Sequence, residues 1–126
     1  MRRVVYDCGV LIAADRDERR AWADHRARLE ANIVPLVPAV VVAQASRSPK
    51  QVSMRRLLRG CEVTAFDEPA AHRAGELLAK SRTKDVVDAA VVELAVRSQA
   101  AIATDDRNDI AILLAVARAK LPIISV

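Results

Sequence analysis

The sequence predicts a three-layer α/β/α fold, with helices on both faces of a central, mostly parallel sheet. Short runs of β-branched and other apolar residues alternate with longer segments that carry apolar residues at helical spacing. Helical crossovers of this kind are the connections that neighbouring parallel strands require. With 126 residues, 52% of them apolar, the chain is long enough to form one domain, residues 1–126, around a buried core.

Five apolar runs have the length of strands. The first, residues 3–6, is short and β-branched, and we place it at the centre of the sheet. The last, Leu121–Val126, carries Pro122 near its start, which favours an edge position because proline cannot donate to a neighbouring strand. The other predicted strands are Ile33–Val37, Cys61–Ala65 and Ala101–Ala103.

Helix-start and helix-stop residues divide the segments between these strands. Pro38 suits the first turn of a helix, where its missing N–H costs nothing, and Asp67 has the side chain of a helix N-cap. Asn32 and Gly60 are residues that commonly end helices. The predicted helices are Val10–Ala14, Asp17–Ala31, Ala39–Ser46, Ser48–Arg59, Asp67–Lys80, a helix that opens at Asp85, and Asp106–Ala119.

Composition narrows the class of protein. The net charge of +4 suits a polyanionic partner, although an arginine-rich soluble surface gives the same value. No apolar run approaches the roughly 18 residues that span a bilayer, and no signal peptide is visible, so we expect a cytoplasmic protein without membrane contact. The three aromatic residues are too few for a base-stacking platform. Cys8 and Cys61 lack metal-site spacing, and we expect them to be reduced.

Acidic residues gather at three turns of the predicted fold. Asp7 follows the first strand, Asp85 and Asp88 open a helix, and a cluster from Asp105 to Asp109 follows the run 100–103. The carboxyl ends of parallel strands meet in one crevice, where several carboxylates repel each other unless a cation or protons intervene. Oxygen ligands favour a hard ion such as Mg²⁺ or Mn²⁺. The pattern therefore suggests a metal-dependent hydrolase of phosphodiesters.

Each of these aspartates also has a structural interpretation. Asp7 is equally suited to cap a helix or to bind a cation. Asp85 and Asp88 share one face of a helical turn, and we expect Asp85 to be the cap and Asp88 the ligand. Either Asp105 or Asp106 fits as a cap for the following helix, and their spacing leaves open which one is functional.

A basic run lies in the middle of the chain. Arg47, Lys50, Arg55, Arg56 and Arg59 follow one another without an acidic residue between them. Arg55 and Arg59 are one helical turn apart and share a face. They are candidates for contacts with a phosphate backbone or an acidic partner, and a solvated face is an equally good interpretation.

Four segments resemble the signatures of a known family. They are VVYDCGVLIA, VPAVVVAQASR, DVVDAAVVELA and IATDDRNDI. In order and over nearly the whole chain, they are similar to the signature segments of PIN-domain nucleases, and more narrowly to those of VapC-like toxins of bacterial type II toxin–antitoxin modules. The resemblance implies a PIN-like α/β/α domain that hydrolyses RNA with Mg²⁺ or Mn²⁺. It also implies a homodimer and inhibition by a cognate antitoxin.

The resemblance also assigns roles to individual residues. It implies that Asp7, Asp88 and Asp106 bind the metal ion and that Thr104 matches the threonine of the family's T-x-D segment. Asp109 would be an accessory acid, to which we add Asp85 from its position. One departure is Gln44, which stands where the family pattern has a glutamate. An amide can orient water but carries no charge, so this substitution is expected to weaken binding of a second cation.

We therefore predict a metal-dependent endoribonuclease in which Gln44 and Thr104 orient water or phosphate. One rival interpretation is a PIN domain that binds RNA or an antitoxin without efficient cleavage, and Gln44 is its main support. The other is a phosphotransfer domain with an aspartate after its first strand. The D-x-D of such a phosphatase is missing, because Asp7 is followed by Cys8 and Gly9. The acidic pair and late lysine of a receiver domain are missing as well.

Overall fold

The chain folds around a five-stranded sheet, which a computed structural model describes over residues 2–126. The strand order is β3-β2-β1-β4-β5, and every neighbouring pair is parallel. The predicted central place of the first strand and edge place of the last are both confirmed. The strands are β1 (Val4–Tyr6), β2 (Leu36–Pro38), β3 (Glu62–Thr64), β4 (Ala101–Thr104) and β5 (Ile123–Ser125).

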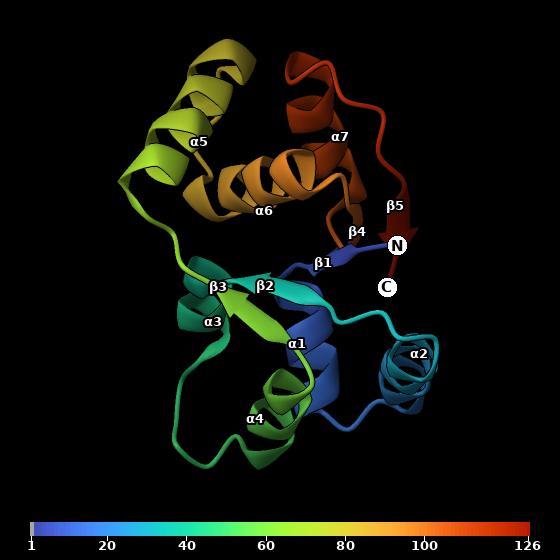
Figure 1. Cartoon of the computed structure of the whole chain (residues 1–126). Coiled ribbons are helices and arrows are strands. Elements are labelled where there is room, and N and C mark those ends of the chain that lie inside the picture. Colours follow the sequence, from blue (N-terminus) through green and yellow to red (C-terminus); the bar gives the residue numbers. More distant parts are fainter. Residues whose placement is uncertain (1) are drawn as a thin grey trace.

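Helices cover both faces of the sheet and complete the predicted three layers (Figure 1). They are α1 (Cys8–Asp15), α2 (Arg19–Glu30), α3 (Ala39–Ala45), α4 (Val52–Arg59), α5 (Glu68–Ser81), α6 (Val86–Ser98) and α7 (Arg107–Val116). On one face α6 packs against the sheet, with α5 and α7 beside it. On the other face α1 packs against the sheet, with α2 and α4 outside it. The short α3 contacts both α1 and α6.

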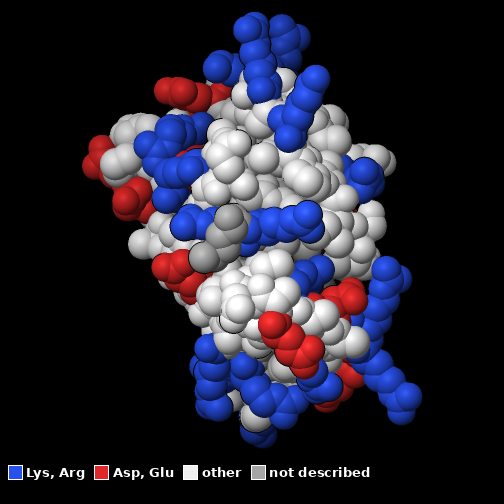
Figure 2. Space-filling model, turned by 45° about the vertical axis from the view of Figure 1, so that its right-hand side comes forward, with Lys and Arg blue, Asp and Glu red and all other residues white. Residues whose placement is uncertain are grey.

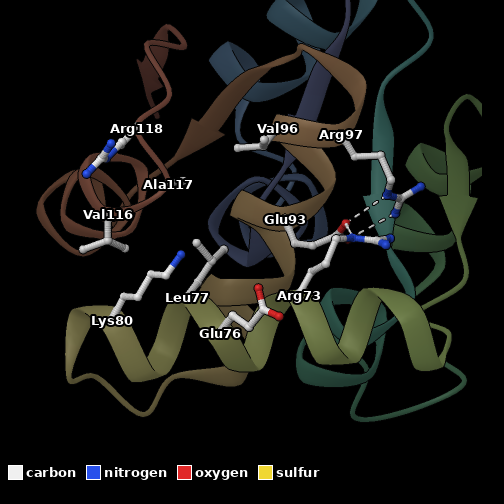
Figure 3. A pocket seen from close by; sticks show the side chains of 10 residues that line it. All are labelled: Arg73, Glu76, Leu77, Lys80, Glu93, Val96, Arg97, Val116, Ala117 and Arg118. Atoms are coloured by element: carbon white, nitrogen blue, oxygen red, sulfur yellow. Dashed lines mark hydrogen bonds and ion pairs between the residues drawn. The ribbon is translucent and has the colours of Figure 1, made fainter.

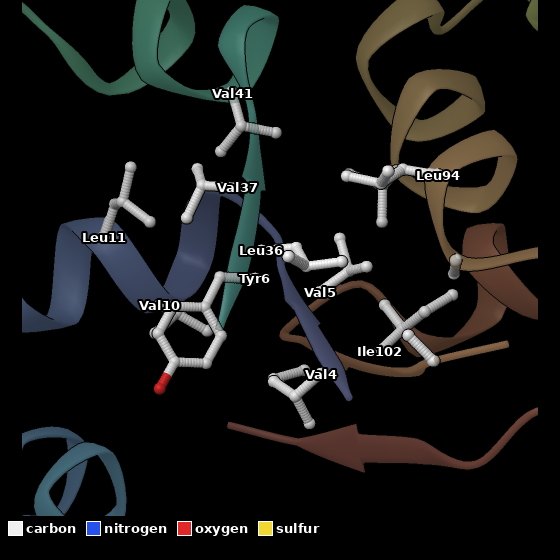
Figure 4. Close-up of a cluster of buried hydrophobic side chains, with 14 of the residues drawn as sticks. Val4, Val5, Tyr6, Val10, Leu11, Leu36, Val37, Val41, Leu94 and Ile102 are labelled. Atoms are coloured by element: carbon white, nitrogen blue, oxygen red, sulfur yellow. The ribbon is translucent and has the colours of Figure 1, made fainter. Parts of the chain in front are cut away.

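The core lies on both sides of β1, whose residues are all buried. Val5 lies toward Leu94 of α6, whereas Tyr6 lies beside Val10 of α1 (Figure 4). Alternation of side chains along the strand thus sends consecutive residues into opposite layers. Complete burial of such side chains contributes about 1.5–3 kcal/mol each. This packing fixes the position of the residue that follows Tyr6.

The register of β1 and β4 aligns their carboxyl ends. Tyr6 pairs with Ala103, and the backbone N–H of Asp7 donates to the carbonyl of Ala103 over 3.0 Å. Asp7 and Thr104 therefore meet at the same edge of the sheet, although 97 positions separate them. The helices α1, α6 and α7 all begin close to this edge, and the charges of Asp7 and Asp106 both act on Asp88 in the first turn of α6.

Several predicted boundaries are wrong by a few residues. The second strand is Leu36–Pro38, not Ile33–Val37, so Pro38 ends a strand and directly precedes α3. The helix predicted from Ser48 starts only at Val52. There the Gln51 side chain accepts hydrogen bonds from the backbone N–H groups of Arg47 and Ser48, which stabilises a loop instead.

Other predicted helix and strand boundaries differ from the observed ones by at most three residues. The first helix starts at Cys8, because the Asp7 side chain caps it, and the second starts at Arg19, because Asp17 adopts a left-handed conformation with φ 54°. The last helix and the last strand are each shorter than predicted at both ends. Both cysteines are free, as expected.

Candidate metal centre

Asp7 is held rigidly at the carboxyl end of β1. Its Oδ1 accepts the backbone N–H of Cys8 over 2.7 Å, and its Oδ2 accepts the Thr104 hydroxyl over 2.6 Å. Burial raises the pKa of Asp7, and these two hydrogen bonds oppose that rise. Asp7 is thus the cap of α1 and a buried carboxylate whose charge contributes to the raised pKa of Asp88, although it is not one of the three carboxylates of the cluster described below.

Thr104 links Asp7 to the next acidic segment. Its hydroxyl oxygen also accepts the backbone N–H of Asp106 over 2.9 Å. One buried hydroxyl therefore positions a side chain after β1 and the backbone after β4. The prediction from sequence assigned Thr104 to water or phosphate, whereas the structure shows its hydroxyl engaged with these two protein groups.

Asp88 lies in the first turn of α6, three residues after the N-cap residue of that helix. Asp85 is the N-cap, as predicted, and its Oδ1 accepts the backbone N–H of Asp88 over 3.0 Å. The Asp88 side chain is buried, and its Oδ2 has no hydrogen-bond partner in residues 2–126. Burial, followed by the charges of Asp85 and Asp7, raises the pKa of Asp88 to about 7. A buried carboxylate without a partner is costly, and a bound cation would remove that cost.

The carboxylates of Asp88, Asp106 and Asp109 lie close together. One ligand oxygen from each of Asp88, Asp106 and Asp109 lies within 4.8 Å of the other two. Partial burial and the charge of Asp109 raise the pKa of Asp106. A cavity of about 230 Å³ borders the cluster and is lined in part by Asp85, Asp88 and Asp109. Mutual repulsion, an orphaned oxygen and an all-oxygen donor set together fit a hard divalent cation.

The side chains of Asp105 and Asp106 lie in different places in the structure. Asp106 belongs to the carboxylate cluster, whereas the Asp105 side chain lies against Gly9 at the start of α1. A Cβ atom at Gly9 would come within 2.5 Å of the Asp105 carboxyl carbon, so any larger residue at position 9 would require the Asp105 side chain to move. Asp105 also raises the pKa of Asp7 through its charge. Asp105 therefore acts on Asp7 through its charge and is not a member of the carboxylate cluster.

Gln44 is not brought into the cluster by any contact among the described residues. It is exposed on α3, which packs against α6 and α1. The neighbouring Arg47 donates through Nη1 to the carbonyls of Ser46 and Ala43, at 2.7 and 3.3 Å. Its charge lowers the otherwise raised pKa of Cys8, so it lies on the Asp7 side of the molecule.

Of the other basic residues of the predicted run, all of them exposed, Arg55, Arg56 and Arg59 lie on α4, whereas Lys50 lies in the loop before it. Arg55 and Arg59 make no side-chain hydrogen bond or ion pair in the described part of the chain. The Arg56 guanidinium lies over the Trp22 ring, 4.8 Å from its centroid, and so also holds α4 to α2. Figure 2 shows that, on the face in view, Lys and Arg side chains are widely spread and gather at the top and the bottom. The basic character is therefore general rather than confined to α4.

Sequence reasoning missed one residue near this site. Lys84 lines the cavity beside Asp85 and Asp88, and its only signal in the sequence is its place directly before the α6 cap. Asp109, predicted as an accessory acid, offers a ligand oxygen within 4.8 Å of those of Asp88 and Asp106. The spacing from Asp106 to Asp109, which places both on one face of a helical turn, is the signal that could have indicated this.

Comparison with protein families identifies the architecture. A family model described as PIN domain matches residues 4–117, which include β1 to α7 and every acidic residue discussed above. The chain belongs to the PIN-domain family. The resemblance inferred from the four sequence segments is thereby confirmed at the level of the family.

Solved structures with the same PIN fold include components of toxin–antitoxin complexes. A chain of VapBC2 from Rickettsia felis, bound to a promoter DNA fragment, has a TM-score of 0.70 at 14% identity, with 98% of both chains covered. A chain of FitAcB from Neisseria gonorrhoeae gives 0.67 at 14% identity, with 96% of both covered. A toxin–antitoxin complex from Klebsiella pneumoniae gives 0.67 at 18% identity, covering 86% of this chain and 90% of that one.

At these identities the likenesses show the fold alone. Comparison with curated proteins gives no match. None of the helices described in residues 2–126 is long and apolar enough to cross a membrane.

Proposed function

We propose that this PIN domain is a metal-dependent endoribonuclease. The observation that carries the proposal is the Asp88 carboxylate, which is buried, lacks a partner for Oδ2 and faces Asp106 and Asp109 within 4.8 Å. When bound, Mg²⁺ or Mn²⁺ supplies Lewis-acid stabilisation of the charge that develops during phosphodiester hydrolysis. Asp88 and Asp106, with Asp7, are the ligands expected from the family, and the proximity of Asp109 supports adding it to the set.

The residues of the chain would divide the work as follows. Asp88, Asp106 and Asp109 would hold the ion together with Asp7, and Asp85 would maintain negative potential beside it while capping α6. Thr104 would act as a positioning residue, because its hydroxyl orients Asp7 and the backbone of Asp106. Gln44 would orient water or phosphate from α3. Arg47, together with Arg55, Arg56 and Arg59 of α4, would contact RNA phosphates or an acidic partner.

The fold of the solved neighbours supports a biological role as a VapC-like toxin. The neighbour from Klebsiella pneumoniae is a toxin–antitoxin complex, and the VapBC2 neighbour is bound to promoter DNA. By analogy of fold we propose that this chain is a cytoplasmic toxin, forms a homodimer and is inhibited by a cognate antitoxin. The RNA substrate and both protein partners are part of the same proposal.

A second candidate is a PIN domain that binds RNA or antitoxin without efficient cleavage. Gln44 favours it, because the position provides no fourth carboxylate and no base. In that case Gln44→Glu should restore cleavage, since the added charge strengthens cation binding at the centre.

The experiment is incubation of purified, antitoxin-free protein with whole-cell RNA in Mg²⁺, in Mn²⁺ or in EDTA. The proposal expects discrete cuts in either metal ion and none in EDTA. If folded protein binds RNA without cutting it, and the Gln44→Glu variant cuts it, the second candidate is favoured. Cleavage that persists undiminished in EDTA would contradict both.

A further inference from the structure

A second and larger cavity lies between α5, α6 and α7. Its volume is about 770 Å³, and it shares no lining residue with the cavity at the candidate metal centre. The middle of the cavity is apolar, with Leu77 on α5, Val96 on α6 and Val116 at the end of α7 (Figure 3). All three are only partly buried. The three helices therefore form a groove with an apolar floor that the described chain leaves uncovered.

Cationic side chains stand at both ends of this α5–α7 groove. Arg73 and Arg97 lie together at one end, and Lys80 and Arg118 lie at the other, across the apolar floor (Figure 3). The acidic residues that line the groove are Glu76 and Glu93. The basic residues thus outnumber the acidic ones, and they occupy two separate positions.

Glu93 organises the first of these positions. Its side chain is only 3% exposed and accepts Arg73 Nε over 2.8 Å, Arg97 Nε over 3.0 Å and Arg97 Nη2 over 3.2 Å. Two guanidinium groups share this single buried carboxylate, so one positive charge remains in excess. Each guanidinium offers five N–H donors, most of which these three contacts leave free for an anion.

The second position has no ion-pair partner among the residues that the structure describes. Lys80 and Arg118 are exposed and form no ion pair with any residue in the described range 2–126. Arg118 belongs to the turn after α7, where its backbone N–H donates to the carbonyl of Ala115 over 3.1 Å. The turn fixes its Cα position above the groove with φ 54°. The groove therefore has a cationic position at each end and an apolar floor between them.

We propose that the α5–α7 groove is a docking site for an acidic amphipathic helix of a partner protein. Such a helix presents apolar residues at i, i+3, i+4 and i+7 to the floor and carboxylates at its two ends to the cations. A second copy of this chain fits less well, because a two-fold contact would place the four cations against the same four. RNA is disfavoured too, because no aromatic side chain lines the groove for base stacking. The proposal is independent of the nuclease activity.

The probe is a fluorescein-labelled helical peptide with leucines on one face and glutamates at both ends, titrated against the full chain by fluorescence anisotropy. One control peptide has the same composition with the leucines distributed around the helix, and a second has lysine in place of every glutamate. The proposal expects saturable binding of the first peptide alone, weakened by added salt. Unlabelled decanoate and a short RNA are added as competitors.

Variants locate the binding. Arg118→Glu is compared with Arg26→Glu, which makes the same charge change at an exposed position on α2 outside the groove. The expected result is an approximately tenfold rise in Kd for Arg118→Glu and little change for Arg26→Glu. Val96→Asp, which places a carboxylate on the apolar floor, should also weaken binding, with folding checked by circular dichroism.

Four outcomes would overturn the proposal. They are absence of saturable binding up to about 1 mM peptide, equal binding of the scrambled peptide, equal effects of Arg118→Glu and Arg26→Glu, and displacement of the peptide by RNA at the groove. A change of oligomeric state caused by Arg118→Glu without any effect on peptide binding would instead assign the groove to contact between copies of this chain. Decanoate binding without peptide binding would assign it to a small amphiphile.

Discussion

Thr104 Oγ1 donates a 2.6 Å hydrogen bond to Asp7 Oδ2, and this contact joins the ends of β1 and β4. The same hydroxyl accepts the backbone N–H of Asp106 over 2.9 Å. Thr104 is completely buried, so its hydroxyl is shielded from bulk water. The geometry at the edge of the sheet therefore depends on one side chain that carries no charge.

Replacement of Thr104 by valine should destabilise the protein. Valine has nearly the same shape but leaves the Asp7 oxygen and the Asp106 N–H without partners, at a cost of about 2 kcal/mol in the free energy of unfolding. Thr104→Ser keeps the hydroxyl and should lose only about 1 kcal/mol, for one buried methyl group. Urea unfolding of the two variants measures the difference. A valine variant at least as stable as the serine variant would contradict the role of the hydroxyl.

Binding of Mn²⁺ should depend on pH around neutrality. The pKa of Asp88 is raised to about 7, so below that pH the ion competes with a proton for the same carboxylate. We expect the affinity to fall by up to about tenfold per pH unit below 7, and to change little above pH 8. Isothermal titration calorimetry at pH 6, 7 and 8 checks this. Equal affinities at the three pH values would rule out Asp88 as a ligand with a raised pKa.

Without a metal ion, stability should decrease as pH rises toward neutrality. The pKa of Asp88 lies above its ordinary value of 3.8, so the folded protein holds a proton that the unfolded chain has already released. This contribution is fully present below about pH 4 and is lost as pH rises to about 7, with a size of about 4 kcal/mol. Thermal unfolding in EDTA measures it. Asp88→Asn cannot ionise, and its pH dependence should be smaller by that amount; an unchanged profile would contradict the assignment.

Glu93→Gln should destabilise the packing of α5 on α6. The buried carboxylate accepts three hydrogen bonds from two arginines, and an amide of the same size would have to place its NH₂ group against one of them. We expect a loss of about 2 kcal/mol in chemical denaturation. Glu76→Gln, exposed in the same groove, is the matched control and should change stability by less than about 0.5 kcal/mol. Similar losses in both variants would exclude a special role for Glu93.

The fold was predictable because its signals are local and repeated. Apolar runs of strand length alternate with capped helices, and Asp67 and Asp85 cap the helices that they were predicted to cap. Boundaries failed where a distant or irregular contact decided them. The loop before α4 depends on the Gln51 side chain, and helix propensity at Ser48 gives no indication of that contact.

The candidate site was predictable in composition but not in geometry. Spacing indicated Asp88 as a ligand and left Asp105 and Asp106 open, because both follow the same strand by one or two residues. The packing of Asp105 on Gly9, about a hundred positions away, separates them, and no local pattern contains it. The buried Glu93 with its two arginines was likewise invisible, because one of its partners, Arg73, lies on another helix.

The most direct test of the carboxylate cluster compares RNA cleavage rates of the wild type, Asp88→Asn and Asp105→Asn in Mg²⁺. Asp88→Asn removes the charge at the centre of the cluster, whereas Asp105→Asn removes one charge that lies outside it. We expect cleavage to vanish in Asp88→Asn and to fall far less in Asp105→Asn. Full activity of folded Asp88→Asn protein, or equal losses in the two variants, would contradict a reaction centred on Asp88.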